Sequence, residues 1–132
     1  MGTIPDGSGA DGPVEGSGSL ITSEVRKELL KHGLEVRTST RQDQEGLLAE
    51  AKTLAVPYVL VGGIPKWEDN ATGWSGKRDY SSIALELYRV GDGVLVASSN
   101  RNVQGVTVPE YWADWLAWTA VADILGKPAP KW

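Results

Sequence analysis

The chain has 132 residues, of which 41% are hydrophobic and 23% are charged, and this composition is typical of a single globular domain. Its formal net charge of −4, without a cluster of lysine or arginine, argues against nucleic acid as a partner, because phosphate binding needs a basic surface. The sequence has no cysteine, which excludes disulfides and cysteine-ligated metals. It also has no apolar run that approaches the length of a membrane-spanning helix, about 20 residues.

The N-terminal residues are rich in glycine and proline, and this predicts a mobile loop or tail over residues 1–18. Within it, Thr3 and Ile4 are all that could remain of a first strand. We expect one folded domain over residues 19–126, followed by a short tail over residues 127–132.

Three stretches have the pattern of helices. The first, Ser19–His32, repeats aliphatic side chains every four residues, and a lone histidine at its end is typically a cap rather than a metal ligand. The second covers residues 40–55 and opens with a capping box. The third covers residues 109–125 and is apolar on two sides, one of which carries tryptophans.

Four stretches have the pattern of strands, namely residues 34–37, 58–61, 79–90 and 94–99, and a Gly-Asp-Gly turn joins the last two into a hairpin. The order of helices and strands in the first half favours parallel pairing. Together the elements predict an α/β sandwich of two or three layers. We expect a mixed sheet of four to five strands, three helices, and a C-terminal β-hairpin followed by an aromatic-rich helix.

A polar loop with two tryptophans separates the strands at residues 58–61 and 79–90. Large apolar side chains are unfavourable in water, so Trp67 and Trp74 must either fold back on the sheet or meet a partner. The tryptophan side of the third helix likewise either covers the core or forms a face for self-association or a partner. The candidate binding residues are therefore Trp67, Glu68, Asp69, Asn70, Trp74 and Lys77 in the loop, and Trp112, Trp115 and Trp118 on the helix.

The only local cluster of carboxylates is formed by Glu68, Asp69 and Asp79. As an acid–base pair or a metal site these side chains would have to converge in a closed pocket, which a small metal-dependent hydrolase would require. The more ordinary interpretation is a solvated loop with neighbouring lysine and arginine as ion partners. No serine has the context of a nucleophile elbow, so we expect no enzymatic activity, no cofactor and no bound metal.

The segment from Trp67 to Lys77 resembles the W-E-D-x-A-T-x-W-S-G segment of a family of uncharacterised proteobacterial lipoproteins, which is a domain of unknown function. A Ser-Gly pair at Ser17 before the first helix, and an A-x-x-L-x-x-x-Y-V-L pattern that begins at Ala51, agree with this resemblance. More distantly, the order of elements is similar to the α/β domains of the N-terminal part of TolB, of the curli secretion lipoprotein and of a lipoprotein activator of a peptidoglycan synthase.

The resemblance implies a protein of the periplasm or associated with the outer membrane, with a binding or accessory role and no known catalysis. It implies a protein or an envelope glycan as partner, homo-oligomers as a further possibility, and membrane contact only through a lipid anchor. The sequence has no cysteine that could carry such an anchor, so we expect the anchor region to have been removed or never present. It also has almost no first strand, and we expect a short N-terminal strand or a second copy to fill that position in the sheet.

Overall fold

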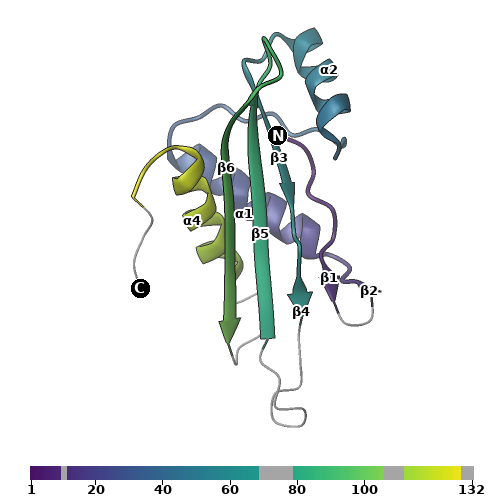
Figure 1. The fold of residues 1–132 in the computed structure, drawn as a ribbon, viewed down its shortest axis with the longest axis vertical. Helices are drawn as coiled ribbons and strands as arrows, with labels where there is room; N and C mark the ends of the chain where they lie inside the picture. The colour runs from purple at the N-terminus through teal and green to yellow at the C-terminus, as the bar shows by residue number, and fades with distance from the viewer. Residues whose placement is uncertain (10–11, 69–78, 106–111, 129–132) are drawn as a thin grey trace.

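A computed structural model describes residues 1–9, 12–68, 79–105 and 112–128 of the chain. Figure 1 shows three helices and a twisted sheet in this part, with a small two-stranded sheet near the N-terminus. The helices are α1 (Ser17–Lys31), α2 (Gln44–Leu54) and α4 (Ala113–Ile124). The strands are β1 (Ser8–Gly9), β2 (Gly12–Pro13), β3 (Tyr58–Gly63), β4 (Trp67–Glu68), β5 (Asp79–Arg89) and β6 (Leu95–Gly105).

The main sheet is built around β5. Both β3 and β4 pair antiparallel with one edge of β5, one after the other along its length, while β6 pairs antiparallel with the opposite edge. The register places Leu60 opposite Leu87 and Trp67 opposite Ser81. The hairpin predicted around the Gly-Asp-Gly turn is therefore present as β5 and β6, and β4 comes from the segment predicted to be a loop.

Two helices cover one face of this sheet. Figure 1 shows α1 crossing behind β5 and β3, with α4 on the β6 side, and the core residues of both helices are buried. The repeat of aliphatic residues in α1 points Ile21 and Val25 into this core, where they meet β5 and the small side chains of α4. Because alanines dominate the buried side of α4, this helix can approach the sheet closely. The core residues include Ile21, Val25, Ile83, Leu85, Leu116, Ala117, Ala120 and Val121.

The predicted fold class, an α/β sandwich with three helices and a C-terminal hairpin before an aromatic-rich helix, is confirmed. Two details of the prediction are wrong. Residues 34–37 form no strand, because this extended segment bonds to the N-terminus through the carbonyl of Arg37 instead of joining a neighbouring strand. The named strands pair antiparallel rather than parallel, and the parallel contact in the described part is an isolated bridge between Gly2 and Ser39.

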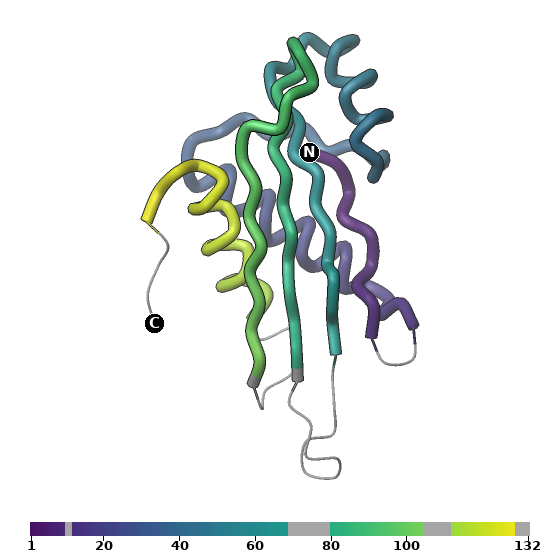
Figure 2. Tube along the Cα trace, in the orientation of Figure 1, coloured from purple at the N-terminus to yellow at the C-terminus, as the bar shows by residue number. Residues whose placement is uncertain are grey.

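The N-terminal segment, expected to be a mobile loop or tail, is instead packed along the sheet. Figure 2 shows residues 1–9 running beside β3 and β4, on the edge that β5 does not occupy. The Gly2 N–H donates to the Leu60 carbonyl at 3.0 Å, and the Ile4 side chain, only 2% exposed, is part of the core. The N-terminal segment therefore lies along this edge without the short strand that was expected, since β1 pairs with β2 and not with β3.

Hydrogen bonds join the same segment to the first turns of α1. The Asp6 carboxylate accepts from the Gly18 N–H at 2.9 Å, and the Thr22 hydroxyl accepts from the Ile4 N–H at 3.0 Å. The Ser17 hydroxyl accepts from the Gly7 N–H at 2.9 Å. A carboxylate at a helix N-terminus is favourable because the first amides of the helix lack partners within it. The contacts fix the crossing of the N-terminal segment over α1.

Candidate functional site

Trp67, the first residue of the predicted binding loop, is a core residue. Its side chain is 1% exposed and lies in the main hydrophobic cluster with Ile64 and Ile4. Its indole Nε1 is buried without a hydrogen-bond partner among the described residues, as is the hydroxyl of Ser81 opposite it. Trp67 therefore follows the alternative in which a loop tryptophan folds onto the sheet, and its indole is not accessible to a partner.

The rest of the predicted loop site is only partly described. Glu68 is half-buried and forms an ion pair with Lys66 at 3.5 Å, and the Lys66 ammonium also lies 4.8 Å from the centre of the Tyr80 ring. Asp69, Asn70, Trp74 and Lys77 lie outside the described residues, and so does the side chain of Asp79. In the parts of the chain that are described, no three acidic or histidine side chains gather to hold a metal ion. No observation there favours the hydrolase alternative.

The three tryptophans on and before α4 occupy different environments. Trp112 and Trp115 pack against the margin of the core, with their rings 6.5 Å apart in an edge-to-face arrangement. Trp118 is 46% exposed on the outer side of the helix. The two interpretations of the aromatic helix therefore apply to different residues: Trp112 and Trp115 cover the core, whereas Trp118 offers a surface.

An ion pair fastens the end of α4 to β6. Arg101 donates from Nε and Nη2 to the two carboxylate oxygens of Asp123, each at 2.7 Å, and the Ser99 hydroxyl donates to the same carboxylate at 2.7 Å. The hydrogen bonds from Arg101 lower the pKa of Asp123 from its usual value, burial opposes this, and the hydrogen bond from Ser99 lowers the pKa further. Such a two-pronged, half-buried pair holds a helix more firmly than a single exposed contact.

We expect the Asp123→Asn variant to unfold with a free energy about 1 kcal/mol lower at pH 7, because Arg101 loses its charged partner. The folded state holds the pKa of Asp123 below that of the unfolded chain, so the stabilisation is present above about pH 4 and is lost as the pH falls through the lowered pKa. Urea denaturation at pH 7 and pH 3 should therefore show a difference between wild type and variant that shrinks in acid. Glu15→Gln, which removes an exposed carboxylate, is the control and should show little difference at either pH.

Next to α4, the outer edge of β6 pairs with no other strand in the described part of the chain. Free edges are usually protected by proline, lysine or a covering element, and β6 contains neither residue. On the face away from α1 and α4, β6 exposes short polar side chains that can face another strand without a clash of charge, namely Ser98, Asn100, Asn102 and Gln104. Figure 1 places α4 and this edge on the same side of the molecule, away from β3. We call the edge of β6 together with Trp118 the β6–α4 side.

A feature that the sequence did not reveal is a half-open cavity of about 730 Å³ beside α2. It lies between this helix, residues 34–39, the start of β3 and the end of α4. Its lining is mostly aliphatic, with contributions from Leu34, Val36, Leu54, Val59, Leu87 and Ile124. No local pattern in the sequence pointed to this cavity, because its wall comes from segments that are far apart in the chain.

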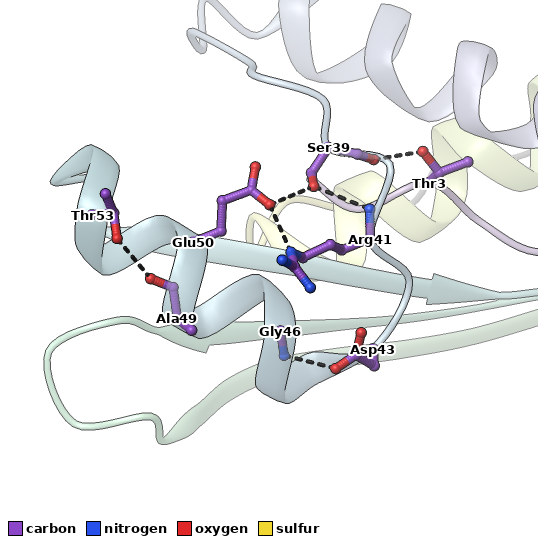
Figure 3. Close-up of polar contacts among 8 residues, drawn as sticks. All are labelled: Thr3, Ser39, Arg41, Asp43, Gly46, Ala49, Glu50 and Thr53. Atoms are coloured by element: carbon purple, nitrogen blue, oxygen red, sulfur yellow. Dashed lines mark hydrogen bonds and ion pairs between the residues drawn. The ribbon is translucent and has the colours of Figure 1, made fainter.

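The helix over this cavity is attached by polar contacts of Glu50 and by a small apolar cluster. Figure 3 shows Glu50 of α2 accepting from the Ser39 hydroxyl at 2.9 Å and pairing with Arg41 Nε at 3.2 Å. The Asp43 carboxylate caps the helix by accepting from the Gly46 N–H at 2.7 Å. The buried apolar cluster beneath α2 is small and separate from the main core, and consists of Leu47, Ala51, Val59 and Val90.

Among the described helices, none combines the length and the apolar character needed to cross a membrane.

Comparison with known proteins gives no matching family model and no matching curated protein. Among solved structures, the chain is similar to the PelC dodecamer from Paraburkholderia phytofirmans, with 18% identity over 97% of this chain and 88% of that chain and a TM-score of 0.68. A variant PelC dodecamer from the same organism gives 20% identity over 89% and 82% of the two chains, with a TM-score of 0.63. The DUF330 protein XCC0632 from Xanthomonas campestris gives 12% identity over 92% and 84%, with a TM-score of 0.53. The chain thus shares its fold with these proteins.

Proposed function

We propose that this protein is a non-catalytic accessory module of a bacterial cell envelope that binds protein, including further copies of itself, through the β6–α4 side. The proposal is carried by the exposure of Trp118, 46% accessible, on α4, a helix that is bonded to β6, together with an outer edge of β6 that no described strand covers. Neither the described contacts nor the comparisons favour a glycan, so the proposal is restricted to protein.

The two features of this side complement each other physically. An exposed indole buries a large apolar area when it enters an interface, and tryptophan is enriched among the residues that dominate binding energy. An open strand edge supplies a row of N–H and C=O groups that another strand can satisfy. Leu95 and Val96, both exposed at the hairpin end of β6, add apolar area next to this edge. The indole would supply the buried anchor of a protein interface, the strand edge its register, and the exposed Leu95 and Val96 its surrounding apolar area.

The solved structures support the self-association. Two PelC structures with the same fold are described as dodecamers. The envelope location and the absence of catalysis both rest on the resemblance of the loop segment to proteobacterial lipoproteins. In the described residues, no three His, Asp or Glu side chains gather in a way that could hold a metal ion.

Replacement of Trp118 by lysine should weaken self-association at least about 30-fold, because a central tryptophan typically contributes about 2 kcal/mol or more to an interface. Light scattering after gel filtration and sedimentation equilibrium would measure the mass over a range of concentrations. Leu54→Lys is the matched control, since Leu54 is 44% exposed but lies on α2, away from the β6–α4 side. A wild-type protein that remains monomeric at all concentrations would contradict the self-association, and so would equal effects of the two variants.

A further inference from the structure

The cavity beside α2 is too large to be a packing defect. Protein interiors are normally filled to the density of organic crystals, and voids larger than a water molecule are few. A volume of about 730 Å³ lies instead in the range of cavities that hold small molecules. The cavity is also one-sided: the main core closes it below, and α2 with residues 34–39 forms its outer wall.

The chemistry of the lining selects an aliphatic ligand. Apart from Tyr58 at the mouth, the side chains of the wall carry no aromatic ring, and its deep residues, such as Leu60, Leu87 and Ile124, are apolar. These aliphatic side chains offer neither a flat surface for stacking nor polar atoms for orienting a sugar or a nucleotide. A flexible chain of methylene groups, by contrast, gains about 0.8 kcal/mol for each group removed from water.

The polar side chains of the lining, those of Glu35, Arg37, Thr38, Ser39 and Glu50, are exposed or half-buried, and the Met1 amino group lies partly buried at the Arg37 carbonyl. Arg37, Thr38 and Ser39 follow one another along one rim, and the Ser39 hydroxyl is already engaged with Glu50. Arg41, the cation nearest to this rim along the chain, is paired with Glu50 at 3.2 Å. Arg37 is exposed, and its guanidinium has no ion pair with any described residue. A free guanidinium at the entrance of an apolar cavity matches a carboxylate head group attached to an apolar tail.

We propose that this cavity binds a single long-chain fatty acid, with its chain along the wall between α2 and β3 and its carboxylate at Arg37. The attachment of α2 supports this, because a helix held by a small apolar cluster and exposed polar bonds can shift to admit a chain more easily than α1 or α4 can. The proposal is independent of the β6–α4 side: the two sites share only α4, which contributes Ile124 to the cavity and Trp118 to that side.

A fluorescence titration of the full chain with cis-parinaric acid, followed by displacement with palmitate, tests the proposal. We expect saturable binding with one site per chain. Ala51→Phe, which fills the cavity from α2, should weaken binding at least about 10-fold, whereas Ala49→Phe on the exposed side of the same helix should leave it unchanged. Because a larger side chain at the buried Ala51 could disturb α2, Val36→Asp provides a second disruption in a segment without regular structure.

The head group is tested separately. Arg37→Gln should weaken displacement by palmitate about 10-fold and leave displacement by hexadecanol unchanged, since only the acid pairs with the guanidinium. Circular dichroism confirms that each variant is folded. Absence of saturable binding to the folded wild type would overturn the proposal, as would unchanged binding in folded Ala51→Phe and Val36→Asp. If Arg37→Gln weakened displacement by palmitate and by hexadecanol to the same degree, the proposed pairing of the carboxylate with Arg37 would be wrong.

Discussion

Replacement of Trp67 by alanine should lower the free energy of unfolding by about 3–5 kcal/mol, the usual cost of deleting a large buried aromatic side chain. The side chain is 1% exposed and fills the space between β5 and the N-terminal segment, where Ile64 and Gly7 contact it. Its indole N–H has no hydrogen-bond partner in the described structure, so truncation loses packing rather than a hydrogen bond, and the removed volume leaves a cavity.

Trp118→Ala is the control for this prediction, because it makes the same chemical change on the surface and should cost well under about 2 kcal/mol in the monomer. Trp67→Phe should retain most of the stability, since it keeps an aromatic ring and removes the N–H that has no partner. Urea denaturation followed by circular dichroism measures all three. If Trp67→Ala and Trp118→Ala cost the same, Trp67 is not part of the core.

The second large effect is expected from a substitution that helix propensity alone would favour. Alanine is about 1 kcal/mol better than glycine inside a helix, yet Gly18→Ala should lower the free energy of unfolding by about 3 kcal/mol. A Cβ atom at position 18 would lie 2.2 Å from the Ile4 carbonyl oxygen and 2.8 Å from the carbonyl carbon of Pro5. Both are backbone atoms, so the N-terminal segment must move away and take Ile4 out of the core.

Gly63→Ala is the matched control, because a Cβ atom there meets nothing within 4 Å and the residue has no positive φ. It should change the stability by less than about 0.5 kcal/mol. Hydrogen exchange of the Ile4 and Gly7 amides, which donate to side chains of α1, reports directly on the contact between the N-terminal segment and this helix. Gly18→Ala should accelerate the exchange of both amides. A Gly18→Ala variant that is more stable than wild type would show that the N-terminal segment does not cross α1 as described.

Much of the fold could be predicted because its signals are local. The four-residue repeat of Ile21, Val25 and Leu29 specifies α1, and a Gly-Asp-Gly turn between apolar runs specifies the hairpin. Residues 34–37 misled the prediction because alternation over four residues is equally compatible with an extended segment that pairs with no strand. The path of residues 1–9 was missed because it depends on the close approach of their backbone to Gly18 in α1. No local sequence pattern predicts a contact between segments of this kind.

The candidate site was less predictable. A tryptophan in a polar stretch is compatible with burial or exposure. Trp67 is buried because β4 pairs with β5, and this pairing could not be read from the sequence. On α4, helical spacing placed Trp112, Trp115 and Trp118 on one broad side but did not show which of them the sheet and α1 leave uncovered. The cavity beside α2 had no signal of its own, since it arises from what the packing of separate elements fails to fill.

The position of the N-terminal segment also limits how copies of this chain can grow into larger particles. In the described structure, residues 1–9 occupy one margin of the main sheet and leave the margin at β6 unoccupied. Joining two copies strand to strand at β6 uses that margin on both, so addition by this route terminates at a symmetric pair and cannot propagate into a fibril. A closed ring of many subunits would need a second, different contact area to join such pairs.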